Sequence, residues 1–167
     1  MKREKTVCFS GHRPEKLPVN HSQIKILKSR LFLEIQEAIN AGYTDFIVGC
    51  ARGVDMWAAL IIMELKNSYP SIKLHCAVPF KGHTSGWSGA ERYDLSAVLN
   101  SADSVTYVSS ERSAQGYSKR NRYMVDNSSL LIAVVTNMRS GTGSTVKYAE
   151  KCGIKVRRIE FEKPLGV

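Results

Sequence analysis

Two glycine turns are the segments of this 167-residue chain best suited to hold an anion. The first, Gly49-Cys50-Ala51-Arg52-Gly53, follows the apolar run Phe46–Val48 and precedes a helical pattern. Glycine lets the backbone approach an anion closely, and the free N–H groups of a helix start favour negative charge. The spacing does not match the dinucleotide fingerprint G-x-G-x-x-G, so this turn alone fits a plain strand-to-helix connection equally well.

A second turn of the same kind favours a phosphate site over a plain strand-to-helix connection. Residues 139–145, Arg-Ser-Gly-Thr-Gly-Ser-Thr, follow the apolar run Leu130–Val135 and precede another helical pattern. The two glycines would give backbone access, while the hydroxyls of Ser144 and Thr145 would donate to phosphate or cap the helix. Two such turns together favour a phosphorylated ligand.

Charged and aromatic side chains near these turns would complete a nucleotide site. Arg13 and Arg52 would neutralise phosphate, because a planar guanidinium suits bidentate contact. Asp55 lies in the first turn of a helix, where it would contact a ribose or simply be favoured by the helix dipole. His12 is either a proton-transfer group or a partner that stabilises its turn. Trp87 either stacks on a base or packs on its own domain.

A dense basic cluster, Lys119-Arg120-Asn121-Arg122, lies in a short helical pattern. It would either close over a bound phosphate or form a solvated helix face. Asp126 follows Arg122 by four residues, so this pair would also stabilise the helix by itself. No nucleophile–base–orienter triad and no paired carboxylates can be traced, so the pattern indicates binding without pointing to catalysis.

Strand and helix patterns alternate along the chain and predict the scaffold. Strands are expected at 6–10, 45–49, 72–80, 104–108, 130–135 and 154–161, and helices at 22–41, 53–68, 90–100, 119–127 and 144–152. Continuously apolar strands indicate a parallel sheet covered on both faces. We therefore predict an α/β, Rossmann-like, doubly wound and mostly parallel sheet. It would form a single nucleotide-binding domain over residues 1–167, with a loose tail at 162–167.

In such a sheet, ligands bind beyond the carboxyl ends of the strands, at a switch in strand order. Each unusual segment follows a strand, so all of them are expected at one edge. The predicted ligand-binding residues are Ser10, Gly11, His12, Arg13, Gly49, Ala51, Arg52, Gly53, Asp55, Trp87, Arg120, Arg122, Gly141, Thr142, Gly143, Ser144 and Thr145.

Composition narrows the class of partner. The net charge of +9 favours nucleotides, single-stranded nucleic acid or acidic surfaces, or it serves solubility alone. The four cysteines contain no C-x-x-C pair, so we expect reduced thiols, no metal site and no cofactor. No apolar run approaches the roughly 20 residues of a membrane span, and the basic start lacks the pattern of a signal peptide. We expect a cytoplasmic protein that contacts no membrane, and its oligomeric state, homo-oligomer included, stays open.

Taken together, these motifs resemble the YpsA-like branch of the SLOG superfamily, Rossmann-like proteins that include DNA-processing protein A and Lonely Guy. The resemblance is carried by Ser10-Gly11-His12-Arg13-Pro14 and by residues 51–59, Ala-Arg-Gly-Val-Asp-Met-Trp-Ala-Ala. It extends from Thr6 to Phe161, with the motifs in the family's order. It implies a ligand-sensing or signalling role.

Two related families supply alternatives. DNA-processing protein A binds single-stranded DNA, and segments of it resemble residues 51–55, Arg120-Asn121-Arg122 and Ser140-Gly141, which makes single-stranded DNA an alternative ligand. Lonely Guy phosphoribohydrolases need a glutamate after a glycine-threonine turn, and Lys147 stands at that position here, with Glu150 one turn further on. We therefore expect binding of a nucleotide-derived ligand rather than turnover, with nucleoside-monophosphate phosphoribohydrolase activity as the remaining alternative.

Overall fold

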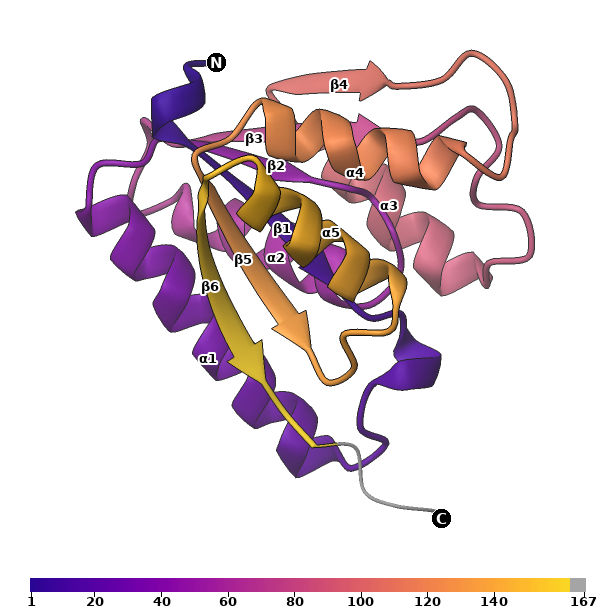
Figure 1. The fold of residues 1–167 in the computed structure, drawn as a ribbon, viewed down its shortest axis with the longest axis horizontal. Coiled ribbons are helices and arrows are strands. Elements are labelled where there is room, and N and C mark those ends of the chain that lie inside the picture. Colours follow the sequence, from indigo (N-terminus) through magenta and orange to yellow (C-terminus); the bar gives the residue numbers. More distant parts are fainter. Residues whose placement is uncertain (163–167) are drawn as a thin grey trace.

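The strands of this protein form one six-stranded sheet in the computed structural model, which describes residues 1–162 (Figure 1). The strands are β1 Thr6–Gly11, β2 Asp45–Val48, β3 Lys73–Val78, β4 Ser104–Tyr107, β5 Leu130–Val135 and β6 Lys155–Glu160. Their order is β4-β3-β2-β1-β5-β6, and every neighbouring pair is parallel. The predicted α/β, Rossmann-like fold is confirmed, and the sheet is parallel throughout its described strands rather than mostly so. Residues 163–167 of the predicted loose tail lie outside the described residues.

Five α-helices cover the two faces of the sheet. They are α1 His21–Asn40, α2 Val54–Leu65, α3 Gly89–Ser101, α4 Gly116–Asp126 and α5 Gly141–Lys151. Helices α1, α2 and α3 pack together on one face, whereas α4 packs beside α5 on the other (Figure 1). Short 3₁₀ turns at Arg3–Lys5 and Pro14–Lys16 precede β1 and α1. The predicted helix at 119–127 begins earlier, at Gly116, where the absence of a Cβ lets the chain approach the ring of Phe80.

The inner strands β1, β2, β3 and β5 bury nearly all of their residues on both faces, which is why their sequences are largely apolar, whereas the edge strands β4 and β6 are mostly exposed or half-buried. Val7 and Phe9 of β1 face the core under α1 to α3, whereas Cys8 between them faces the smaller core under α4 and α5. Helix α1 adds a buried stripe at Leu27, Leu31, Ile35 and Ala38, the three- and four-residue spacing of one helix face. The two cores hold the carboxyl ends of the strands in fixed positions.

The strand order reverses between β1 and β5. From β1 the chain proceeds through β2 and β3 to the edge strand β4, and α4 then returns it across the sheet to β5 on the other side of β1. The connections after β1 and after β5 therefore leave in opposite directions. Such a switch point opens a crevice at the carboxyl ends of the two strands.

A line of side-chain hydrogen bonds joins three strands near their amino ends, a connection that local sequence patterns do not predict. The His75 Nε2 atom lies 2.7 Å from Asp45 Oδ1, and its Nδ1 atom lies 2.7 Å from Ser104 Oγ. Asp45 and Ser104 begin β2 and β4, and His75 is the third residue of β3; all three lie at the edge opposite the switch point, and none of them lines the pockets described below. The chain of contacts satisfies the buried Asp45 carboxylate and the His75 ring, as buried polar groups require.

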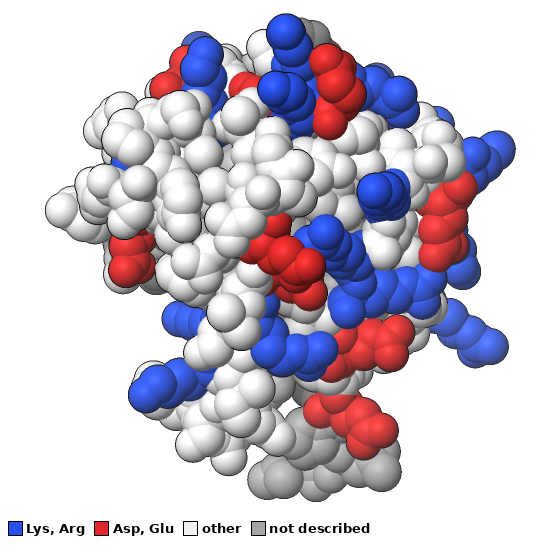
Figure 2. Space-filling model, turned by 90° about the vertical axis from the view of Figure 1, so that its left-hand side faces the viewer, with Lys and Arg blue, Asp and Glu red and all other residues white. Residues whose placement is uncertain are grey.

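Charge is distributed over the surface in both signs. On the face shown in Figure 2, basic and acidic side chains intermingle. Ion pairs across the molecule include Arg157 with Glu34 at 3.3 Å and Lys66 with Asp103 at 2.6 Å. Within residues 1–162, no helix is long and apolar enough to cross a membrane, and no group of three or more His, Cys, Asp or Glu residues is placed to hold a metal ion.

We predict that Gly53→Ala destabilises the protein more than Gly42→Ala does. Both glycines have positive φ, 87° and 97°, so each substitution carries left-handed strain of about 1–2 kcal/mol. A Cβ at Gly53 would also lie 2.5 Å from the His12 carbonyl oxygen, whereas Gly42 has open space around it. Urea unfolding should show at least about 1 kcal/mol of extra loss for Gly53→Ala. Equal losses in the two variants would contradict this account of the packing between the two loops.

Candidate functional site

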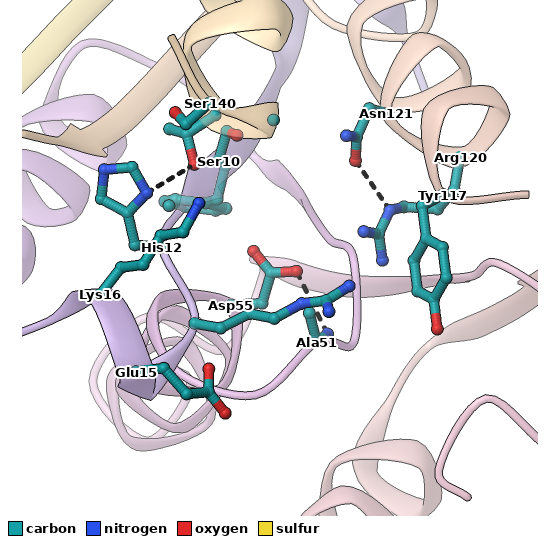
Figure 3. Close-up of a pocket in the computed structure, with 15 residues that line it drawn as sticks. Ser10, His12, Glu15, Lys16, Ala51, Asp55, Tyr117, Arg120, Asn121 and Ser140 are labelled. Atoms are coloured by element: carbon teal, nitrogen blue, oxygen red, sulfur yellow. Dashed lines mark hydrogen bonds between the residues drawn. The ribbon is translucent and has the colours of Figure 1, made fainter. Parts of the chain in front are cut away.

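A pocket of about 340 Å³ lies at the switch point (Figure 3). Four segments that are distant in sequence build it: the end of β1 with its loop, the first glycine turn with α2, the start of α4, and the second glycine turn with α5. Its lining residues are Phe9, Ser10, Gly11, His12, Arg13, Glu15, Lys16, Ala51, Asp55, Tyr117, Arg120, Asn121, Ser140, Gly141 and Thr142.

The floor of the pocket carries a buried carboxylate and a buried guanidinium. Asp55 accepts a hydrogen bond from the Ala51 amide at 3.2 Å, and Arg120 donates to the Gly49 carbonyl and, through Nε, to Asn121 Oδ1 at 2.8 Å. A Cβ added at Gly49 would lie 2.7 Å from Asp55 Oδ2 and 2.9 Å from Arg120 Nη1. Gly49 is therefore required because these two charged groups occupy the space beside it.

Burial and opposite charge act against each other in this pair. Burial raises the pKa of the Asp55 carboxyl, and the positive charge of Arg120 opposes that rise. Burial likewise lowers the pKa of the Arg120 guanidinium, opposed by the charge of Asp55. Each group thus reduces the desolvation cost of the other, and the pocket floor presents carboxylate oxygens beside N–H donors.

His12 is held in one tautomer on the wall of the pocket. Its Nε2 atom accepts a hydrogen bond from the Thr136 amide at 3.0 Å, so in this contact Nε2 carries no proton. The neutral ring therefore carries its proton on Nδ1, which lies 3.4 Å from Thr142 Oγ1. Burial, together with the nearby Lys16 charge, lowers the pKa of His12. Of the two roles predicted for His12, the contacts match the turn-stabilising one.

The first residues of α5 line the pocket. Ser140 caps the helix by accepting from the Gly143 amide at 3.1 Å, while Gly141 and Thr142, the first helical residues, line the pocket. The first amides of a helix have no partner inside the helix, so those of Gly141 and Thr142 are available to an anion. A Cβ at Gly141 would meet nothing within 4 Å, whereas one at Gly143 would lie 1.9 Å from the Met138 carbonyl oxygen. Gly141 thus gives access, and Gly143 permits packing.

The remaining predicted residues lie outside the pocket. Arg52 is not a lining residue; it pairs with Glu15, which does line the pocket, at 2.6 Å and with Glu91 at 3.6 Å, and it lines a separate groove with Gly53 and Trp87. An adjoining groove of about 330 Å³ between α4 and α5 is lined in part by Arg122, Ser144, Thr145 and Tyr148. In that groove the Thr145 hydroxyl donates to the Gly141 carbonyl at 3.0 Å, and the Arg122 guanidinium lies 5.2 Å from the centre of the Tyr148 ring.

Sequence reasoning missed several lining residues, of which Tyr117 is the largest. The Arg13 guanidinium lies 5.0 Å from the centre of its ring, and Phe80 meets it edge-on with ring centres 5.3 Å apart. Tyr117 lies three residues before Arg120 and four before Asn121, so all three share one helix face (Figure 3). That spacing in the sequence could have placed Tyr117 and Asn121 beside Arg120. The other residues missed in this way are Phe9, Glu15, Lys16, Asn121 and Ser140.

Comparison with known proteins agrees with this architecture. A family model described as the YspA SLOG family matches residues 7–163. The chain belongs to this YpsA family. Among its relatives, the SPbeta prophage-derived protein YoqJ of Bacillus subtilis is 33% identical over 138 residues, 75% of this chain and 81% of that protein. The UPF0398 protein of Bacillus thuringiensis is 24% identical over 152 residues, 88% of this chain and 83% of that protein.

Two solved structures share the fold of this YpsA-family chain. DNA processing protein A of Streptococcus pneumoniae superposes with a TM-score of 0.65 and that of Helicobacter pylori with 0.62, each at 18% sequence identity. The superpositions cover 97% and 93% of this chain. They cover 52% and 65% of the two longer proteins, so this chain spans between half and two thirds of their length.

We predict that neutral His12 makes the stability of this YpsA-family protein dependent on pH. Its folded pKa lies below the ordinary value of 6.5, so its stabilising effect is full above that value and is lost as pH falls through the folded pKa. Unfolding free energies measured between about pH 7 and pH 5 should fall more steeply for the wild type than for His12→Gln, which retains an acceptor for the Thr136 amide. Parallel pH profiles of the two proteins would contradict the lowered pKa of His12.

Proposed function

We propose that the pocket binds a nucleotide-derived phosphorylated ligand and that the protein acts as a sensor of that ligand. The observation that carries this proposal is the pairing, in one cavity, of the open start of α5 with the buried Asp55 carboxylate. A nucleotide presents the complementary set, an anionic phosphate and neutral hydroxyls. The volume of about 340 Å³ falls within the usual range of small-molecule sites.

The phosphate is assigned to the start of α5. Gly141 and Thr142 line the pocket there, so their helix-start amides would serve as anion donors, and Lys16 and Arg13 line it nearby and would add positive charge. The start of α2 is less suitable, because the Asp55 carboxylate already lies in its first turn and would repel an anion. Of the two predicted phosphate turns, the second is therefore the one assigned to phosphate.

The remainder of the ligand is assigned to the side of the pocket formed by α2 and α4. An ionised Asp55 is an acceptor only, so it suits the hydroxyl groups of a ribose. The ring of Tyr117 gives an aromatic surface on the same side, beside Arg120 and Asn121 (Figure 3). Arg52 would act indirectly, because its ion pair with Glu15 holds the loop that carries Arg13 and Lys16.

Single-stranded DNA is the second candidate, favoured by the groove that continues from the pocket. The groove shares Tyr117, Asn121 and Gly141 with the pocket and adds Arg122 and Tyr148, a cation and an aromatic ring of the kind that bind phosphates and stacked bases. The structural relative from Helicobacter pylori is described as binding single-stranded DNA. A longer ligand of this class would use Arg122, Ser144 and Thr145.

Phosphoribohydrolase activity is the third candidate, and α5 offers it little support. Lys147 is exposed, and Glu150 forms an ion pair with Arg158; neither lines the pocket. Asp55 is the buried carboxylate within reach of a ligand, and the contacts described supply it with no partner acid or base for bond cleavage. Turnover would therefore depend on Asp55.

We expect Asp55→Asn and Lys16→Ala each to weaken nucleotide binding by about tenfold or more, since each loses a contact to a charged group. Calorimetry with AMP, ADP-ribose and NAD would measure this, after a thermal-shift screen identifies the binder. Arg122→Ala is the matched control and should change affinity less than about twofold, because Arg122 lines only the adjoining groove. Full affinity in both pocket variants would refute the site assignment.

An oligo-dT titration distinguishes the second candidate from the first. A small nucleotide should bind with weak salt dependence, whereas DNA affinity should fall steeply with salt because several phosphates release counterions. Single-stranded DNA binding would be supported only if Arg122→Ala weakens oligo-dT binding and reduces by about one the slope of log affinity against log salt concentration. Turnover is tested by incubating the bound nucleotide with the protein and analysing the products by mass spectrometry. Release of free base by the wild type but not by Asp55→Asn would establish the hydrolase activity.

A further inference from the structure

A second groove, of about 400 Å³, follows the outer face of α2 between α1 and α3. Its lining includes Lys28 of α1, Trp57 and Leu60 of α2, Trp87 just before α3, and Asp94 of α3. Trp57 and Trp87 are half-buried in it, and Leu60 is 40% exposed. Its lining differs from that of the ligand pocket, and the function proposed above makes no use of it.

Helix α2 is unusually apolar for a helix with one face open. Asp55 and Glu64 are its only charged residues, and Asp55 faces the ligand pocket. A helix that is apolar around most of its circumference is normally covered on all sides. Large aromatic side chains in a shallow groove are also the residues that most often anchor a protein interface. These features indicate that another protein surface covers α2.

The two rims of the groove carry opposite charges that have no ion-pair partner among the described residues. Lys28 lies on the α1 rim, with its Nζ atom 5.2 Å from the centre of the Trp57 ring, and Asp94 lies on the α3 rim. Neither forms a salt bridge within residues 1–162. Both line the groove together with Met56, Trp57 and Leu60, which lie in the first two turns of α2.

We propose that a second copy of this chain covers the groove, related by a two-fold axis parallel to α2. Rotation about that axis sets the α1 rim of each copy against the α3 rim of the other, so Lys28 of one copy meets Asp94 of the other at two equivalent places. A two-fold axis perpendicular to α2 in the same plane would set α1 against α1 and bring the two Lys28 side chains together. Opposite charge therefore selects the first arrangement, and the apolar centre would bury Trp57, Leu60 and Trp87.

The two copies would also brace the loops that form the ligand pocket. Pro14, Arg52 and Gly53 line the groove, while Arg13 and Glu15 from the same loop line the pocket. Covering the groove would thus restrict the loop from its outer side. The dimer itself does not depend on any ligand, so its test is independent of the proposed function.

Sedimentation velocity from about 1 to 100 µM protein tests the proposal with a charge exchange, since a micromolar dimer would be almost fully associated at the upper limit. We expect the wild type to dimerise and Lys28→Asp and Asp94→Lys each to weaken association at least tenfold. The double variant Lys28→Asp/Asp94→Lys should regain wild-type association because both contacts are restored with reversed sign. Lys25→Asp, an exposed α1 position outside the groove, is the matched control and should dimerise like the wild type.

Three outcomes would overturn the proposal. The first is a wild type that stays monomeric throughout the concentration range. The second is a single variant at Lys28 or Asp94 that associates as strongly as the Lys25 control. The third is a double variant that stays as weak as the single ones, which would mean that the two residues do not face each other. Circular dichroism of each variant separates lost association from lost folding.

Discussion

The placement of Asp55 and Arg120 on either side of Gly49 is the constraint on which the rest of the site depends. Either charge buried alone would cost several kcal/mol. Their proximity offsets this cost, together with the hydrogen bonds from the Ala51 amide to Asp55 and from Arg120 to the Gly49 carbonyl. Asp55 belongs to α2 and Arg120 to α4, on opposite faces of the sheet, so this one contact region ties the two layers together at the carboxyl end of β2.

That constraint also separates the two glycine turns by function. In the first turn the protein supplies its own negative charge at the helix start, and Gly49 and Gly53 serve packing against charged groups and the His12 backbone. In the second turn the helix start remains open, and Gly141 borders free space. Two segments of similar composition thus differ in the charge that each can accept.

The loop after β1 connects the pocket to the groove along α2. Its residues Arg13 and Lys16 face the pocket, while Pro14 faces the groove, and the Glu15–Arg52 ion pair fastens the loop to the first glycine turn. An exposed ion pair of this kind contributes little stability by itself, so its value lies in orienting the loop. Whatever occupies one side of the loop therefore influences the other side.

Local sequence patterns were sufficient for the scaffold and for the edge that carries the site. Apolar runs of strand length alternating with helical periodicity led to a parallel sheet, and the position of each polar segment after a strand placed the glycine turns at one edge, as the structure has them. Strand order and side-chain partners depend instead on long-range contacts, which local periodicity does not encode. The reversal between β1 and β5 brought Tyr117 and Lys16 into the pocket, and Arg52, which does not line the pocket, pairs with Glu15 and Glu91, each more than thirty residues away in sequence.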